Sequence, residues 1–199
     1  MIVLSWNVHG IGSLCHRASI RDLLASTKAN VVVLQQTKVA SLPLGYIREL
    51  WHLKEPGWAS VDAVGSASGI LLMWDTNTSE VLDRCSGSYS LGIKLRDKGS
   101  GNIWCLVGVY SPTRHQKRHL FWEDLSRTCQ KWPIPLMLVG DFNVTRFCHE
   151  KSPLSRRITT SMRLFADFIS SWDLDEIALS GKTFTWSNGR QPPVLSKLD

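Results

Sequence analysis

The chain has 199 residues, of which 43% are hydrophobic and 20% are charged, so it is long enough to bury a core and too apolar for a disordered segment. Its five cysteines are odd in number and show no CxxC spacing, which argues against a disulfide framework and a zinc knuckle. The formal net charge of +6 suits a phosphate-bearing partner, but a solvated basic face has the same charge.

The first predicted elements alternate between strand and helix. Residues 1–6 (MIVLSW) form an apolar run typical of a strand, and the β-branched run at 29–35 is too short for a helix. Between them, residues 20–27 predict an amphipathic helix. Its apolar face would consist of Ile20, Leu23, Leu24 and Thr27. Five more strands, separated by Gly, Ser and Asp-Lys-Gly turn signals, are predicted at 57–63, 69–74, 80–85, 89–96 and 102–109.

The second half of the chain predicts helices at 115–130 and 157–172, with a strand at 134–140 between them. The apolar face of the later helix would consist of Ile158, Met162, Phe165, Ile169 and Trp172. Consecutive strands mixed with isolated helices predict an α/β fold of two packed sheets with helices outside. With no repeat or linker in the sequence, we expect a single domain over 1–199.

The apolar runs, such as 69–74, are far shorter than the roughly eighteen residues of a membrane-spanning helix. The start MIVLSWN lacks the basic lead and long apolar centre of a signal peptide. We therefore expect an intracellular protein without a membrane partner. Its basic residues gather at 114–119 (RHQKRH) and between Arg146 and Arg157.

Polar side chains directly after buried strands are the candidates for chemistry, because a strand end is rigid and its loop is open to solvent. Such positions hold Asn7, Gln36, Tyr110, Asp141 and Asn143. In the sequence GDFN, the glycine lets the backbone turn, and the Asp–Asn pair has the groups that orient a water and hold a phosphoryl oxygen. An Asx-turn that closes a strand is the alternative for the same residues.

The motifs SWNVHG, VVLQQTK, GVYSP, GDFN and SKLD, in this order and spacing, resemble the endonuclease/exonuclease/phosphatase superfamily. The stretches LSWNVHGIGS, GSASGILLMWD and TFTWSNGR are similar to the endonuclease domain of LINE-type, non-LTR retrotransposons. The similarity runs from Met1 to Asp199. It implies a four-layer α/β sandwich of two mixed sheets with helices on the outer faces, and Mg²⁺-dependent cleavage of phosphodiesters, with Mn²⁺ as a possible substitute and DNA as the partner. It implies a nuclear location for a functional protein, and no small-molecule cofactor.

The resemblance also implies roles for individual residues. Asn7 matches the asparagine beside the metal, and Gln36 falls where the family has its metal-binding glutamate. Tyr110 matches the tyrosine near the scissile phosphate, and Asp141 the aspartate that orients water. Two further matches are Asn143, with the transition-state asparagine, and Asp199, with the aspartate that orients the catalytic histidine.

Gln36 is the first departure from the family pattern. Mg²⁺ prefers anionic oxygen, and glutamine keeps the shape of glutamate without its charge. One charge against two at roughly 2 Å is worth up to about 4 kcal/mol in water, or roughly a thousandfold in affinity. We therefore expect weakened metal binding.

The second departure is that the sequence ends at Asp199, before the family's late Ser-Asp-His motif. We expect a C-terminally truncated fold that lacks its terminal strand and exposes a sheet edge and apolar surface. None of the six histidines stands in that motif: His9, His16, His52, His115, His119 and His149. His9, two residues after Asn7, and His149 are the two substitutes to weigh, and His149 more readily fits a surface loop.

In the DNA interpretation, three basic side chains contact backbone phosphates: Arg114, Lys117 and Arg118. Trp186 and Asn188 line the groove for the strand. The alternation of Phe184 and Trp186 in TFTWS equally predicts a core position for Trp186.

Three functions stay open from the sequence. The first is a metal-dependent DNA endonuclease of the retrotransposon type, impaired by Gln36 and the missing histidine. The second is a catalytically silent remnant that binds nucleic acid through its basic loops. The third is a phosphodiesterase that acts on another phosphate ester, since one fold serves many substrates.

Overall fold

A computed structural model describes residues 1–63, 69–154 and 157–199 of the chain. Residues 65–68 of the motif GSASGILLMWD and residues 155–156 of the second basic stretch lie outside this part. The chain forms two compact units. The first comprises Met1–Tyr110 and Glu123–Asp141, and the second comprises Ser111–Trp122 and Phe142–Asp199. The single domain over 1–199 stays a prediction.

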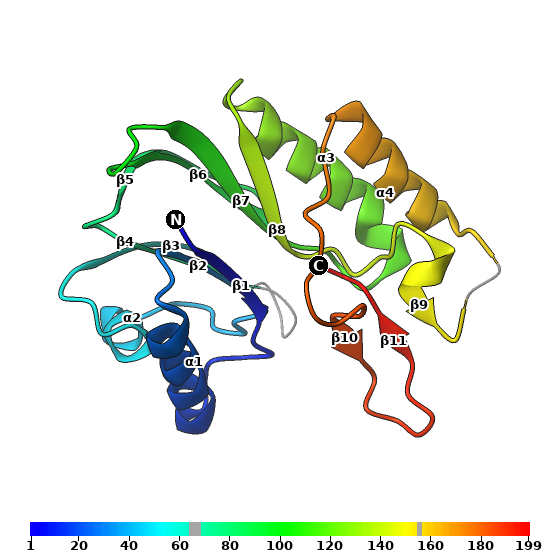
Figure 1. The fold of residues 1–199 in the computed structure, drawn as a ribbon, viewed down its shortest axis with the longest axis horizontal. Coiled ribbons are helices and arrows are strands. Elements are labelled where there is room, and N and C mark those ends of the chain that lie inside the picture. Colours follow the sequence, from blue (N-terminus) through cyan, green and yellow to red (C-terminus); the bar gives the residue numbers. More distant parts are fainter. Residues whose placement is uncertain (64–68, 155–156) are drawn as a thin grey trace. The chain divides into compact units, whose positions relative to one another are not determined.

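Two mixed sheets of four strands form the centre of the first unit (Figure 1). The first sheet has the strand order β1-β2-β4-β3, in which only β1 and β2 run parallel. Its strands are β1 (Val3–Asn7), β2 (Val31–Gln35), β3 (Pro56–Val61) and β4 (Ile70–Asp75). Every residue of β2 is buried, as expected for a β-branched run covered on both faces.

The second sheet has the order β5-β6-β7-β8, and its one parallel pair is β7 with β8. Its strands are β5 (Ser79–Ser86), β6 (Ser90–Asp97), β7 (Ile103–Tyr110) and β8 (Leu136–Asp141). Apolar side chains of both sheets form one buried cluster. A Cβ atom at Gly108 would lie 2.5 Å from Val33 Cγ1, so the glycine permits the close approach of β7 to β2.

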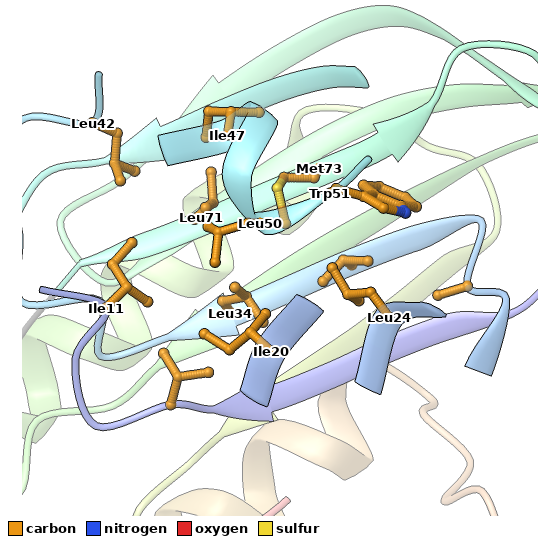
Figure 2. Packing of buried hydrophobic residues seen from close by; sticks show 13 residues of the cluster. Ile11, Ile20, Leu24, Leu34, Leu42, Ile47, Leu50, Trp51, Leu71 and Met73 are labelled. Atoms are coloured by element: carbon orange, nitrogen blue, oxygen red, sulfur yellow. The ribbon is translucent and has the colours of Figure 1, made fainter. Parts of the chain in front are cut away.

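Helices cover the outer faces of both sheets. The side chains of α1 (Leu14–Thr27) and α2 (Leu44–Leu50) share a core with β2 and β4, and Figure 2 shows its members. On the second sheet lie residues 123–130 of α3 (Arg118–Gln130), where Thr128 Oγ1 is 2.8 Å from Ser90 Oγ of β6. The four-layer α/β sandwich expected from the sequence is therefore confirmed.

The second unit has little regular structure apart from α4 (Thr160–Ser171) and the first turn of α3. A three-stranded sheet in the order β10-β11-β9 consists of β9 (Lys151–Ser152), β10 (Trp186–Ser187) and β11 (Leu195–Ser196). Two 3₁₀ turns are η1 (His115–Lys117) and η2 (Cys148–Glu150). Aromatic rings pack together beside α4: Phe121, Trp122, Phe142, Phe165 and Phe168.

All eight strands predicted before residue 141 are present, and the three predicted helices are confirmed with shifted ends. Helix α4 begins at Thr160, because the Thr159 hydroxyl accepts a hydrogen bond from the Met162 amide and caps it. Ile158 therefore precedes the helix and is 58% exposed, so its predicted place on the apolar face was wrong. No helix among the described residues has the length and apolar character to cross a membrane.

Candidate active site

The parallel pair β1 and β2 carries two of the predicted site residues at its carboxyl end. Asn7 is the register partner of Gln35, and Gln36 is the next residue. Gln35 is fully buried and donates from Nε2 to Ser5 Oγ and to the Val33 carbonyl, so its amide nitrogen is held within the sheet. Gln36 is half-buried and has a left-handed backbone, with φ of 57°. The chain therefore leaves the sheet at Gln36.

The parallel pair β7 and β8 of the other sheet carries Tyr110 and Asp141, which are register partners. Gly140, directly before Asp141, has φ of 132°, and a Cβ atom there would lie 2.2 Å from the Val109 carbonyl oxygen. A side chain at this position would meet backbone, so only glycine fits. The turn that presents Asp141 depends on this residue.

Asn7 and Asp141 meet across the two sheets, although 134 positions separate them in the sequence. Asn7 Nδ2 donates to Asp141 Oδ2 at 2.7 Å, and Asn7 Oδ1 accepts from the His9 amide at 3.2 Å. Asp141 is only 6% exposed. The amide therefore fixes the orientation of a buried carboxylate, because both ends of the Asn7 side chain are engaged.

Burial and the neighbouring charge of Asp141 raise the pKa of Tyr110 to about 12. Both causes disfavour the phenolate. The Tyr110 hydroxyl thus keeps its proton at any physiological pH and is a hydrogen-bond donor.

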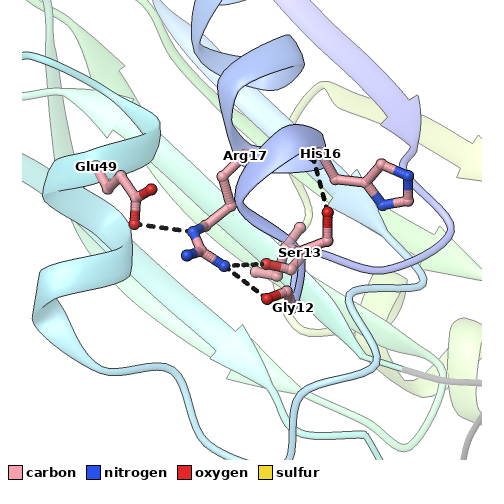
Figure 3. Close-up of polar contacts among 6 residues, drawn as sticks. Gly12, Ser13, His16, Arg17 and Glu49 are labelled. Carbon is pink, nitrogen blue, oxygen red and sulfur yellow. Dashed lines mark hydrogen bonds and ion pairs between the residues drawn. The ribbon is translucent and has the colours of Figure 1, made fainter.

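A buried arginine holds the loop that follows Asn7 (Figure 3). Arg17 of α1 donates from Nη1 to the carbonyls of Ile11 and Gly12, each at 2.9 Å, and from Nε to Glu49 of α2 at 2.8 Å. The Ile11 amide donates to the Thr37 carbonyl at 3.0 Å. The loops after β1 and β2 are therefore tied to each other and to both helices.

Arg17 was not among the site residues predicted from the sequence. A signal was present, because Arg17 precedes Ile20 and Leu24 by three and seven residues, so it lies on the apolar face of α1. A charged residue on such a face is buried only with partners. Its partner Glu49 lies on α2, a helix of seven residues that the sequence analysis missed.

In the second unit, Asn143 also has a left-handed backbone, with φ of 50°. Its Nδ2 donates to the Ser111 carbonyl at 2.8 Å, and its carbonyl accepts from Arg118 Nη2 at 2.6 Å. Asp199 is exposed and follows Leu198, whose amide donates to Thr185 Oγ1 at 2.9 Å and whose carbonyl accepts from the Phe142 amide at 2.9 Å. The roles of Asn143 and Asp199 stay predictions.

The predicted DNA-contacting residues differ in exposure. Arg114 and Lys117 are exposed, whereas Arg118 is buried at 7% and bonded to Asn143. Burial lowers the pKa of Arg118. Because Arg118 Nη2 already donates to the Asn143 carbonyl, fewer guanidinium N–H groups are available to a phosphate than the sequence predicted.

Trp186 is 38% exposed, so the alternative core position was wrong. The strand β10 has only two residues, too few for alternation to bury one face. Asn188 Oδ1 accepts from the amides of Arg190 and Val194, which fixes the turn between β10 and β11. Contact of Trp186 and Asn188 with DNA stays a prediction.

Neither substitute histidine shows a catalytic arrangement. His9 is exposed with φ of 52°, and its hydrogen bond to Asn7 Oδ1 comes from the backbone amide. His149 is exposed on η2 and stacks on Phe147, which agrees with the predicted surface position.

The donor set at Asn7, Gln36 and Asp141 does not fit a tightly held Mg²⁺. That ion takes oxygen ligands and is usually bound through one or two carboxylates. Among the residues that the structure describes, no three His, Cys, Asp or Glu side chains are grouped to hold a metal ion. Gln36 is neutral, and Asn7 Oδ1 and Asp141 Oδ2 already have partners.

Comparisons with known structures agree on the fold. The chain is similar to the endonuclease domain of TRAS1, a telomere-specific non-LTR retrotransposon, with a TM-score of 0.72 and 15% identity over 98% of this chain and 81% of that one. It is similar to an AP endonuclease from Archaeoglobus fulgidus, with a TM-score of 0.63 and 16% identity over 86% and 71% of the two chains. It is also similar to the AP endonuclease LMAP from Leishmania major, with a TM-score of 0.63 and 15% identity over 84% of this chain and 65% of that one.

A comparison with curated proteins gave no match. The model of the endonuclease/exonuclease/phosphatase family, in contrast, matches residues 4–195, which is nearly the whole chain and covers most of both compact units. The chain belongs to the endonuclease/exonuclease/phosphatase family.

Proposed function

We propose that the chain is a DNA endonuclease domain of the non-LTR retrotransposon type, with a reaction slowed by Gln36. The observation that carries the proposal is the hydrogen bond of 2.7 Å between Asn7 and Asp141 at the ends of β1 and β8. Similarity to the TRAS1 domain supports DNA as the substrate. The net charge of +6 favours a phosphate-bearing substrate.

The chemistry of the site follows from its two best-ordered groups. Asp141 is a carboxylate with an orientation fixed by Asn7, and a fixed carboxylate accepts the proton of an attacking water. Tyr110, the register partner of Asp141, keeps its proton because its pKa is raised to about 12. It donates a hydrogen bond to a phosphoryl oxygen as negative charge develops there.

Gln36 weakens this arrangement. Its amide follows the register partner of Asn7, where the family resemblance implies a metal-binding glutamate. When bound, Mg²⁺ would supply charge neutralisation at the phosphate. A neutral ligand lowers its affinity, so we expect little turnover at cellular Mg²⁺ concentrations.

A second candidate, favoured by the same residue, is a catalytically silent domain that binds nucleic acid. The described residues contain a single carboxylate in the Asn7–Gln36–Asp141 set and no grouped metal ligands. Exposed Arg114 and Lys117 are suited to phosphate contacts. This candidate predicts DNA binding that weakens steeply with salt, without cleavage.

Nicking of supercoiled plasmid separates the two candidates. We expect slow nicking that needs Mg²⁺ or Mn²⁺, and a rate at least about 100-fold lower in Asp141→Ala, in keeping with the loss of a positioned base. Asp22→Ala is the matched control, because the Asp22 side chain is 76% exposed. Gln36→Glu should lower the Mg²⁺ concentration for half-maximal nicking.

Two results would overturn the endonuclease proposal. One is the absence of nicking by the wild type and by Gln36→Glu at every Mg²⁺ and Mn²⁺ concentration, with salt-dependent DNA binding retained, which would establish the silent domain. The other is nicking that Asp141→Ala leaves unchanged, because the Asn7–Asp141 pair would then have no part in it.

A further inference from the structure

The turn at residues 146–150 of the second unit carries an aromatic stack outside the candidate active site. The rings of Phe147 and His149 are nearly parallel, with 10° between their planes and 5.4 Å between their centroids. The guanidinium carbon of Arg146 lies 4.9 Å from the centroid of the Phe147 ring. Phe147 is 41% exposed and His149 is exposed. The exposed part of such a stack has a π-face suited to a flat ligand.

A buried carboxylate holds the turn in shape. Glu150 is 6% exposed, and its Oε2 accepts from the amides of Arg146 at 2.6 Å and Phe147 at 2.9 Å. The Glu150 carbonyl accepts from the Lys197 amide at 3.0 Å. Because its backbone is fixed from both sides, the stack is preorganised rather than one state of a loose loop.

A cavity of about 290 Å³ opens beside the stack. Its size lies just below the roughly 300–1,000 Å³ of small-ligand pockets, which suits a single flat ring system. The cavity lining also carries both signs of charge. The side chains that matter are Phe147, His149, Glu150, Glu176, Lys182 and Lys197.

The charged groups of the cavity differ in whether they are engaged in ion pairs. Lys197 pairs with Glu176 and lies 3.9 Å from Glu150 Oε1, so one ammonium offsets only one of the two carboxylates. Lys182 is exposed at the rim. A ligand with a flat aromatic body, amino groups for carboxylate oxygens and one negative charge for a lysine would match all three features.

We propose that this cavity binds an unpaired nucleobase of a DNA strand, with the base stacked on the Phe147–His149 pair and a flanking phosphate at Lys182. The proposal rests on the proposed function as a DNA-acting domain. Base–aromatic stacking tolerates any sequence, because every base has a π-face. Carboxylates accept hydrogen bonds from the exocyclic amines of cytosine and adenine. A base in a duplex is stacked on both sides, so the site selects unpaired positions.

The test measures binding to DNA labelled with 2-aminopurine, whose fluorescence falls when it stacks. Three probes of one sequence are compared in EDTA at low salt: a paired duplex, the same duplex with one unpaired 2-aminopurine, and the single strand. We expect about tenfold tighter binding of the two unpaired probes, with quenching. Phe147→Ala and His149→Ala should each remove most of this preference, while affinity for the paired duplex stays within about twofold.

Leu164→Ala is the matched control, because Leu164 of α4 is 40% exposed, almost the same as Phe147, and does not line the cavity. It should leave all three affinities unchanged. Equal thermal unfolding of the variants shows that the second unit is folded. Equal affinity of the wild type for paired and unpaired probes would overturn the proposal, as would a Phe147→Ala result like that of the control.

Failure here is distinguishable from failure of the endonuclease proposal. Loss of the unpaired-base preference, with Asp141-dependent nicking intact, removes only the stacking site. Absence of binding to every probe overturns the stacking site, and the nicking assay then decides independently whether DNA is a substrate.

Discussion

Two loops that carry a predicted functional asparagine are each held by a buried arginine, and the two arginines differ in their partners. Arg17 of the first unit binds the loop after Asn7, and it also has Glu49 at 2.8 Å and the Tyr46 ring at 4.3 Å from its guanidinium carbon. Arg118 of the second unit binds the Asn143 carbonyl. Within the described residues, no carboxylate lies in ion-pair range of Arg118.

The difference shows how burial of the same group has two energetic consequences. A buried guanidinium with a carboxylate and two carbonyls recovers most of the cost of leaving water. A buried guanidinium without a counter-charge does not recover this cost. Desolvation accordingly lowers the pKa of Arg118. Arg118 Nε is also buried without a hydrogen-bond partner. Arg17 should therefore stabilise its unit far more than Arg118 stabilises its own.

Arg17→Met is expected to show the largest effect. The change leaves the Ile11 and Gly12 carbonyls and the partly buried Glu49 carboxylate without their donor, at a cost of about 3 kcal/mol of unfolding free energy. Urea unfolding measures it. The matched control is Arg96→Met, because Arg96 and Glu80 are also 2.8 Å apart but are 43% and 48% exposed, which predicts a cost below about 1 kcal/mol. Equal costs for the two variants would contradict the comparison.

The contrast also separates what the sequence could predict from what it could not. The positions of Asn7, Tyr110 and Asp141 at strand ends could be predicted because a strand end is visible in the sequence, while their roles stay predictions. Arg17 and Glu49 are 32 positions apart in the sequence, and their pairing depends on a contact between two helices. No local sequence pattern predicts such a contact. Helix α2 was missed because seven residues with a glycine among them give too little periodicity.

The second unit was harder to predict for the same reason. Its strands have two residues each, too few to show alternation, and β9 pairs with β11 across more than forty positions, as between Ser152 and Leu195. Its loops are shaped by side-chain bonds to backbone, such as Asn143 to Ser111 and Glu150 to Arg146. The residue types in these bonds are equally common in solvated loops. The sequence alone therefore does not distinguish a bonded loop from a solvated one.

Arg118→Met is expected to lower the unfolding free energy by about 1 kcal/mol. The variant loses the hydrogen bond to the Asn143 carbonyl, but it also no longer buries a charge, which offsets part of the loss. Urea unfolding beside Arg17→Met gives the comparison directly. A cost for Arg118→Met equal to or above that of Arg17→Met would show that Arg118 has a compensating partner after all. Arg118→Lys should not restore stability, since an ammonium keeps the charge without the planar fork.

Tyr110 tests the same desolvation rule with the opposite charge, and its effect is the smallest. The folded-state pKa of about 12 lies above the ordinary value of 10.0, so between these values the unfolded chain has released the proton and the folded chain has not. Stability therefore falls as pH rises through about 10, and this group contributes a loss of less than about 1 kcal/mol at pH 10.5. The pKa values of Cys105 and Cys129 are raised to about 11 and about 12. Both thiols therefore also lower the stability of the protein as the pH rises. Tyr110→Phe keeps both cysteines, so the difference between the unfolding free energies of variant and wild type at pH 9 and pH 10.5 isolates the phenol. A difference that does not change with pH would mean that the Tyr110 hydroxyl ionises as readily in the folded chain as in water, and it would then be no fixed donor beside Asp141.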